Sequence, residues 1–213
     1  FQNGRLVALD YVASIEDTPI KAVLLSGSKG NVSGEQRRIG MFCGIIEGRL
    51  GISEEEATTM AEDFNETLIN TGKAECAEAK FSVEGIGWGN WTEEGGLTAS
   101  EDLITANSDL TLAMGENDQM LFGTITALEN AGLENVDIIA AADGAQRGYD
   151  YIKEGVIFAI GENSPIMVAR KGVDVAEEIL IDDVDPSTYD KITVTQAVSV
   201  TKENVDERYD YGT

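Results

Sequence analysis

Residues 110–142 read LTLAMGENDQMLFGTITALENAGLENVDIIAAA and contain a strand, a helix and a second strand. The apolar run at 110–114 is short and continuous, which is typical of a strand buried on both faces. A helix is expected from Asp118 to Ala131, and Gly132 ends it because glycine readily takes the left-handed conformation at a helix C-terminus. The run at 136–142 returns to strand. A strand, a helix and a strand in this order predict two parallel strands with the helix packed across the sheet.

The same alternation extends in both directions from this unit. Before it, the sequence predicts strands at 22–25 and 81–86, helices at 4–15, 52–69 and 92–106, and a helix capped by Ser33. Ser53 and Glu56 have the spacing of a capping box at the start of the helix at 52–69. After it, helices are predicted at 146–153 and 164–181, and strands at 156–160 and 192–200. The predicted fold class is α/β, a doubly wound parallel sheet with helices on both faces.

Polar or aromatic residues follow the predicted strands where the chain leaves the sheet: Arg37, Trp91, Asn117, Asp143 and Glu162. In doubly wound sheets the loops at the carboxyl ends of the strands form the ligand crevice. We therefore expect these side chains to gather at one edge of the sheet. A small-molecule receptor is the function that this arrangement favours.

The chemistry of these side chains suits a polyhydroxylated ligand. A guanidinium donates two parallel hydrogen bonds, a carboxylate accepts them, and an amide does both. An indole at the edge of a crevice covers the apolar face of a sugar ring. Plainer interpretations stand beside these: one of Arg37 and Arg38 is expected in a surface salt bridge, and either Trp88 or Trp91 in the core.

The composition argues against several other classes of function. Among the 213 residues, 39 Asp and Glu against 15 Lys and Arg give a net charge of -24, which repels nucleic acid and anionic membranes. The sequence has no histidine, so neither zinc binding nor histidine-based catalysis is expected. Cys43 and Cys76 form one disulfide or remain buried thiols.

No metal or cofactor site is predicted. The loop GSKG at 27–30 follows a strand as a phosphate-binding loop does, but Asn31 stands where such a loop needs a fixed Gly-Lys-Ser/Thr order. The acidic run at 182–185 lacks the glycine and terminal glutamate of a calcium-binding EF-hand loop. No run of about 18 apolar residues is present, so no bilayer-spanning segment is expected.

Four segments resemble the type I periplasmic sugar-binding proteins, and the resemblance covers nearly the whole chain. They are SGEQRRIG at 33–40, ENDQMLFG at 116–123, Asp143-Gly144 and VTKENV at 200–205. The second segment, with the helix end ALENAG at 127–132, is the most specific. The resemblance implies a two-lobed solute-binding protein that closes around a small sugar and delivers it to an ABC transporter membrane permease. It also implies a location outside the cytoplasm, either in the periplasm or lipid-anchored at the cell surface.

The resemblance further implies roles for single residues. Family members contact the sugar from the carboxyl-terminal lobe with residues that match Arg37, Trp91, Asn117 and Asp143. After the fifth strand the family carries an amide residue where this chain has Glu162 followed by Asn163. Either Glu162 replaces the amide, or Asn163 takes its role. If Glu162 faces the cleft near Asp143, the two carboxylates compete for hydrogen-bond donors.

The resemblance also predicts how the chain is divided. Residues 1–162 are expected to form the carboxyl-terminal sugar-binding lobe, 163–195 to belong to the amino-terminal lobe, and 196–213 to form a return strand and an acidic tail. With this division the chain lacks most of the amino-terminal lobe, so a truncated chain is expected. The apolar face of 164–195 then needs a partner, and the tail is either a disordered end or a strand partner.

Two other functions fit the same residues. The sugar-sensing half of a transcriptional repressor has the same fold, with its DNA-binding helices placed upstream. A glycoside hydrolase would use Asp143 and Glu162 as paired carboxylates. The lack of histidine, of a nucleophile next to a base and of a metal cluster favours a binding protein without catalysis.

Overall fold

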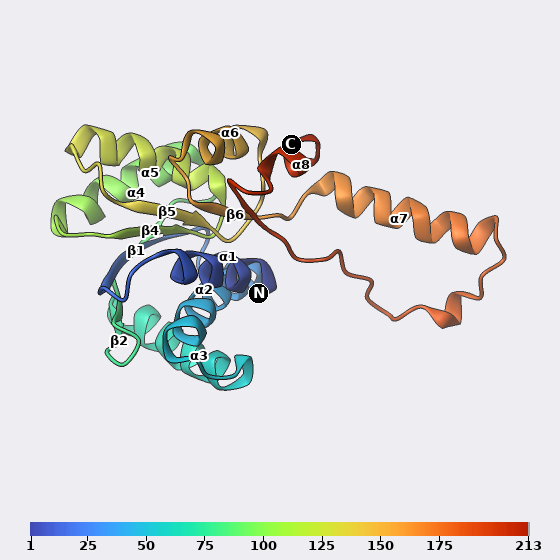
Figure 1. The fold of residues 1–213 in the computed structure, drawn as a ribbon, viewed down its shortest axis with the longest axis horizontal. Coiled ribbons are helices and arrows are strands. Elements are labelled where there is room, and N and C mark those ends of the chain that lie inside the picture. Colours follow the sequence, from blue (N-terminus) through green and yellow to red (C-terminus); the bar gives the residue numbers. More distant parts are fainter. Residues whose placement is uncertain (213) are drawn as a thin grey trace.

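The computed structural model describes residues 1–212 and has the predicted α/β fold (Figure 1). Within these residues, seven strands form one sheet in the order β2-β3-β1-β4-β5-β6-β7. The strands are β1 (Ile20–Ser26), β2 (Ala74–Cys76), β3 (Phe81–Trp88), β4 (Leu112–Gly115), β5 (Asp137–Ala140), β6 (Ala159–Gly161) and β7 (Ser199–Thr201). The five inner strands are parallel, whereas β2 and β7 run antiparallel to β3 and β6. The sheet is therefore mostly parallel, with an antiparallel strand at each edge.

Helices cover both faces of the sheet, as the sequence predicts (Figure 1). One face packs against α1 (Gln2–Ser14), α2 (Val32–Leu50) and α3 (Glu54–Thr71). The other packs against α4 (Glu93–Ala106), α5 (Asp118–Ala131) and α6 (Gln146–Glu154). Along β1 the side chains alternate, so that Ala22 and Leu24 join the first core while Val23 and Leu25 join the second. This two-sided burial explains the continuous apolar run in the strand.

The helix ends follow local signals, with one correction. Ser53 and Glu56 form the predicted capping box of α3, and Gly132 ends α5 in the left-handed conformation at φ 68°. The cap of α2 is Asn31 rather than Ser33, because the Asn31 side chain accepts a hydrogen bond from the Gly34 N–H at 2.9 Å. Ser33 lies inside the first turn of the helix. The helix thus begins earlier than predicted.

The predicted strand at 192–200 is wrong for most of its length. Only β7 is strand, because residues before Ser199 have no neighbouring strand to pair with. The tail after Asn204 is neither a disordered end nor a strand partner: it forms α8 (Val205–Arg208) and a 3₁₀ turn, Tyr209–Tyr211. It docks on α6, where Tyr209 donates to Asp150 at 2.9 Å. Residue 213, the last of the predicted tail, lies outside the described residues.

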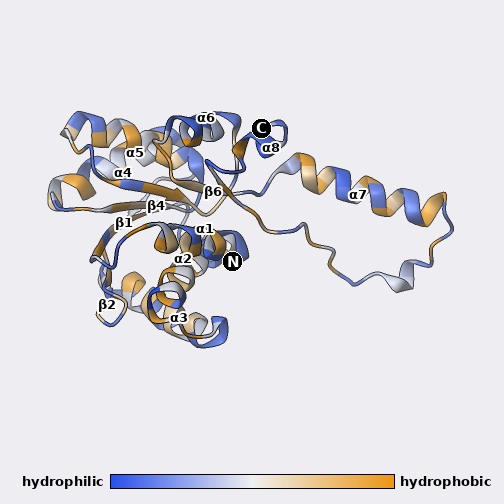
Figure 2. Ribbon diagram, in the orientation of Figure 1, coloured by the Kyte–Doolittle hydropathy of each residue, from blue (hydrophilic) through white to orange (hydrophobic). Residues whose placement is uncertain are grey.

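Residues 163–198, here called the arm, leave the body of the molecule and return to it (Figure 1). The arm contains α7 (Pro165–Leu180), a 3₁₀ turn at Pro186–Thr188 and an extended return segment. No residue of α7 is buried, and Val173 and Leu180 are 64% and 79% exposed. Apolar and polar residues alternate in bands along this helix (Figure 2). Much of its apolar side is therefore uncovered among the described residues.

Cys43 and Cys76 are both buried and both free thiols, so the disulfide alternative is wrong. Burial is the main cause that raises the pKa of the Cys43 thiol above its ordinary value. In the part of the chain that the structure describes, no helix combines the length and apolar character needed to cross a membrane.

Candidate functional site

The carboxyl edge of the sheet brings together four of the residues predicted from the strand ends. Arg37 extends from α2, and its Nη2 donates to Oδ1 of Asp143, which follows β5, at 2.7 Å. The Arg37 guanidinium also lies over the Trp91 ring, 5.5 Å from its centroid. Asn117, which follows β4, donates to the Trp91 carbonyl oxygen at 3.4 Å. Side chains that follow β1, β3, β4 and β5 therefore meet in one cluster, as the topology requires.

Trp91 is held in place by its backbone and by two glycines. Asn90 and Trp91 both have left-handed φ values, 49° and 66°, which form a tight turn after β3. The indole fills the space beside Gly27, where an added Cβ would lie 1.9 Å from its Cε2. It also approaches Gly34, where a Cβ would lie 3.1 Å from its Cη2. The glycine at position 27 thus makes room for an aromatic ring.

Trp88 has a different environment from Trp91. It lies within β3 and is half-buried, and the Lys29 Nζ lies 5.3 Å from its ring centroid. The Trp91 ring instead lies beside the Arg37 guanidinium, and the Trp91 carbonyl oxygen accepts a hydrogen bond from Asn117. Of the two indoles, Trp91 is the one that shares the cluster with the guanidinium and the carboxylate.

The clustered side chains differ in how much polar surface they leave open. The Arg37 and Asp143 side chains are 18% and 39% exposed, so both can be reached from solvent. Asn117 is only 4% exposed, and its Oδ1 accepts the Met120 N–H at 3.1 Å, which caps α5. Arg37 and Asp143 therefore present the main polar surface, while Asn117 fixes the start of α5 and the position of Trp91.

A buried ion pair that the sequence reasoning did not single out lies beneath this cluster. The Glu116 carboxylate is fully buried and accepts from Ser26 Oγ at 2.6 Å, from the Gly27 N–H at 2.8 Å and from Arg38 Nη1 at 3.0 Å. Arg38 also donates to Asn65 at 2.6 Å. Of the two arginines, Arg38 is buried with Glu116, whereas Arg37 forms its salt bridge with the partly exposed Asp143. In the sequence, the feature that could have indicated this pair is the position of Glu116 directly after the apolar strand β4.

Glu162 and Asn163 occupy different surroundings. Glu162 is 6% exposed; its Oε1 accepts from the Tyr149 hydroxyl at 3.2 Å, and its Oε2 lies 3.7 Å from Arg208 Nη2. Burial and this carboxylate raise the pKa of the Tyr149 hydroxyl, which keeps it protonated as a donor. Asn163 is exposed, and its N–H donates to the Asp143 carbonyl oxygen at 2.8 Å. Each carboxylate thus has its own cationic partner, Arg37 for Asp143 and Arg208 for Glu162.

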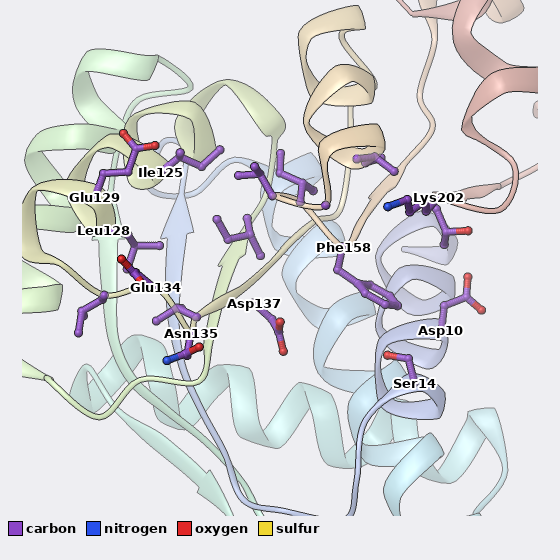
Figure 3. A pocket seen from close by; sticks show the side chains of 18 of the residues that line it. Asp10, Ser14, Ile125, Leu128, Glu129, Glu134, Asn135, Asp137, Phe158 and Lys202 are labelled. Carbon is purple, nitrogen blue, oxygen red and sulfur yellow. The ribbon is translucent and has the colours of Figure 1, made fainter.

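A large hollow lies elsewhere, at the amino-terminal edge of the parallel strands (Figure 3). It is an open cleft of about 1220 Å³, with Asp10 and Ser14 of α1 on one side and Leu128 and Glu129 of α5 on the other. None of the residues predicted from the strand ends lines it. Within residues 1–212, no group of three or more potential ligands is placed to hold a metal ion.

The fold is an α/β domain with a mostly parallel sheet, and its polar cluster lies at the carboxyl ends of the parallel strands. Comparison with known families identifies the family within this class of fold. The chain belongs to the periplasmic binding protein domain family, whose model matches residues 1–183.

Curated relatives carry more specific names. The chain is similar to the ribose import binding proteins RbsB of Salmonella typhimurium, at 31% identity, and Escherichia coli, at 29%. Each match extends over 177 residues, which are 83% of this chain and 49% of the relative. The chain therefore spans about half the length of these relatives.

Solved structures share the fold at lower identity. A periplasmic solute-binding protein of an ABC transporter from Actinobacillus succinogenes, with bound D-allose, matches with a TM-score of 0.70 and 22% identity, over 97% of this chain and 61% of that one. The binding protein of the arabinose ABC transporter from Shewanella, bound to L-arabinofuranose, matches with a TM-score of 0.68 and 18% identity, over 98% and 59%. At these identities the likeness establishes the fold alone.

Proposed function

We propose that this chain forms the sugar-contacting lobe of an extracytoplasmic solute-binding protein, which captures a monosaccharide or related small sugar and delivers it to an ABC importer. The observation that carries the proposal is the cluster of Arg37, Trp91 and Asp143 at the carboxyl edge of the sheet. Membership of the periplasmic binding protein family supports it. The ribose import binding proteins to which the chain is similar support a sugar as the class of ligand.

The side chains of the cluster match the surface of a sugar. Arg37 donates hydrogen bonds and Asp143 accepts them, so the pair can serve adjacent hydroxyl groups. The Trp91 ring offers an apolar face to the C–H side of the sugar ring. A ligand would share the hydrogen bond that Arg37 now donates to Asp143. The pre-formed ion pair keeps both groups in place before the ligand arrives.

Capture by closure requires a second lobe. We infer that residues 163–195, which make up most of the arm, pack with such a lobe. The lobe would cover the exposed apolar side of α7. The lobe would add hydrogen bonds to the sugar only in the closed form, and these would stabilise closure. A permease of the ABC importer would then receive the closed form. The location proposed is the periplasm or, with a lipid anchor, the cell surface.

The two alternatives have less support. The relatives named above are import binding proteins rather than repressors, and a net charge of -24 does not favour an approach to DNA. The glycoside hydrolase hypothesis needs Glu162 beside Asp143 in the crevice, whereas the Glu162 carboxylate is buried against Tyr149 and Arg208. A binding protein without catalysis remains the better proposal.

A thermal-shift screen followed by calorimetry tests the proposal on the full-length protein. D-ribose, D-allose and L-arabinose form the panel, with glycerol as a polyol that lacks a ring. Trp91→Ala is expected to weaken binding of the best sugar by about tenfold or more, since an aromatic contact contributes on the order of 1 kcal/mol beyond its buried area. Trp88→Ala is the matched control and should bind as the wild type does. Equal effects of the two substitutions, or no shift with any sugar, would contradict the proposed site.

A further inference from the structure

Asp118 is a buried acid that touches the candidate site only through the backbone. It is the first residue of α5, directly after the cap Asn117, and is 1% exposed. Its Oδ2 accepts two hydrogen bonds, from the Gly144 N–H at 3.1 Å and from the Ala145 N–H at 2.7 Å. These are the two residues that directly follow Asp143. One carboxylate oxygen therefore ties α5 to the loop that carries the exposed acid.

The same loop is restrained at two further points, one on each side of the Asp118 contact. Gly144 has φ 98°, and a Cβ at that position would lie 2.6 Å from the Tyr149 hydroxyl, so the backbone is confined from the side of α6. On the other side, the Asp143 carbonyl oxygen accepts from the Asn163 N–H at 2.8 Å. The Asp118 contact fixes the stretch between these two restraints.

The second oxygen of Asp118 makes the placement unusual. Oδ1 is buried and has no hydrogen-bond partner among the described residues. A buried acceptor without a partner destabilises the folded state. Asp118 therefore does not look like an acid placed for stability alone. A single carbonyl-type oxygen at Oδ2 suffices for both hydrogen bonds, so an asparagine can make them too.

We propose that Asp118 is the positioning residue of the site: by holding the Gly144 and Ala145 N–H groups it aims the Asp143 carboxylate at Arg37 and at the ligand. Asp118 does not contact the ligand itself, because it is buried. The ligand part of this inference rests on the proposed sugar-binding function. The geometric part, which concerns the Arg37–Asp143 pair, does not depend on any ligand.

Two variants act on the tie from opposite sides: one removes both of its hydrogen bonds, and the other removes the shorter one. Asp118→Ala deletes the acceptor. Ala145→Pro deletes the N–H that makes the shorter bond, and its backbone φ of -69° already suits proline. Asp118→Asn is the conservative variant that keeps one acceptor oxygen. Thr124→Ala is the control for lost stability, because Thr124 is buried in the same helix and bonds Ser100 at 2.8 Å, apart from the cluster.

Ligand-free crystal structures of the full-length variants provide the first readout. In Asp118→Ala and Ala145→Pro, the Arg37 Nη2 to Asp143 Oδ1 distance, 2.7 Å in this structure, is expected to exceed the ion-pair limit of about 4 Å. In Asp118→Asn and Thr124→Ala it should stay within that limit. An unchanged ion pair in both disrupting variants would overturn the proposal, whatever the ligand. If Asp118→Ala fails to fold, Ala145→Pro still decides the question.

Calorimetry with D-ribose and D-allose provides the second readout. Each disrupting variant is expected to weaken sugar binding about tenfold or more, since small misplacements of a binding group carry penalties of this order. In an Asp143→Asn background the Asp118→Ala effect should shrink to about twofold or less, because Asp118 acts through Asp143. A merely structural role would give the same loss in both backgrounds, and that result would refute the proposal. If the ion pair breaks as expected but the wild type binds neither sugar, the positioning role stands and the proposed ligand class fails.

Discussion

The Glu116 carboxylate and the Arg38 guanidinium form a buried pair beneath Trp91. Their side chains are 0% and 7% exposed, so neither group can be solvated in place of its partner. Such a pair adds little stability relative to a well-packed apolar core, but loss of one member leaves an uncompensated buried charge. The Glu116 carboxylate accepts from the Gly27 N–H, and Gly27 and Gly34 are the two glycines that the Trp91 ring approaches.

Glu116→Ala is therefore expected to lower the free energy of unfolding by about 3–5 kcal/mol, because Arg38 keeps its charge and loses its carboxylate. Asp109→Ala is the matched control, since it removes an acid from an exposed pair with Lys21 and should shift the unfolding midpoint little. Urea unfolding followed by circular dichroism measures both variants. Comparable destabilisation by the two substitutions would contradict this account.

The burial of Asp118 is expected to make the stability of the folded state depend on pH, and it determines the sign of this dependence. Burial is the main cause that raises the pKa of its carboxyl group, and the charge of Asp143 adds to it, while the Ala145 N–H opposes it. A folded-state pKa above the unfolded value of about 3.9 means that folding favours the protonated form. This contribution to stability is complete below the unfolded pKa and is lost as the pH rises through the folded pKa.

Asp118→Asn does not titrate at this position, so it isolates the effect. The stability of the wild type relative to Asp118→Asn is expected to fall when the pH rises from about 3.5 to about 7. Urea unfolding of both proteins at the two pH values measures the difference, in which the other titrating groups largely cancel. If the stability of the wild type relative to Asp118→Asn rises with pH instead, the hydrogen bonds to Asp118 lower the pKa of its carboxyl group.

Among the elements, α7 differs most from the rest of the fold. None of its 16 residues is buried, whereas most of the 14 residues of α5 are. An isolated helix of this length is marginally stable in water, because helices in proteins depend on packing of an apolar face. With its apolar side exposed, α7 therefore lacks the packing that stabilises the other helices.

Hydrogen exchange should separate these two helices. In the chain of residues 1–213, amides of Pro165–Leu180 are expected to exchange at least about 100-fold faster than those of Asp118–Ala131. Mass spectrometry of peptides from the two helices measures both in one sample, so α5 is an internal control. Equal protection would show that α7 has a packing partner, such as a second copy of the chain.

Elements with a strong local pattern were predictable from the sequence. The bounds of α5 agree at both ends, because a cap, an apolar periodicity and Gly132 all lie within the stretch itself. The strand predicted at 192–200 fails for the opposite reason: a strand needs a neighbour, and only Ser199–Thr201 has one. The acidic tail is helical because it docks on α6, which no local pattern reveals.

The site was predictable to the extent that topology determines it. The parallel strands end at one edge, so Arg37, Trp91 and Asp143 had to meet there. The partners of Glu116 and Glu162 were not predictable, because Arg38 lies 78 residues from Glu116 in the chain and Arg208 belongs to the tail. Contacts of this kind depend on tertiary packing and leave no spacing in the sequence.

The whole molecule carries a net charge of -24 on 213 residues. Charges of one sign repel across the compact state, and dissolved salt screens this repulsion over about 10 Å at 0.1 M. The ion pairs described above are few beside this excess of acid. Self-repulsion is thus expected to dominate the response to salt.

Raising NaCl from about 10 mM to about 150 mM is expected to increase the Tm by a few degrees, because screening weakens the repulsion between acidic groups. KCl should act equally, which distinguishes screening from binding of a particular cation. Differential scanning calorimetry at fixed pH measures both series. A Tm that falls with salt would mean that attractive ion pairs outweigh the repulsion.

The chain leaves the body and returns to it at neighbouring positions, because β6 and β7 are antiparallel neighbours with Gly161 opposite Ser199. Neighbouring antiparallel strands need no more than a two-residue turn to connect them. In topological terms the arm is an insertion into a hairpin. A tight loop can replace it, a foreign module can be grafted in its place, or new chain ends can be opened within it, and the register of the sheet stays the same.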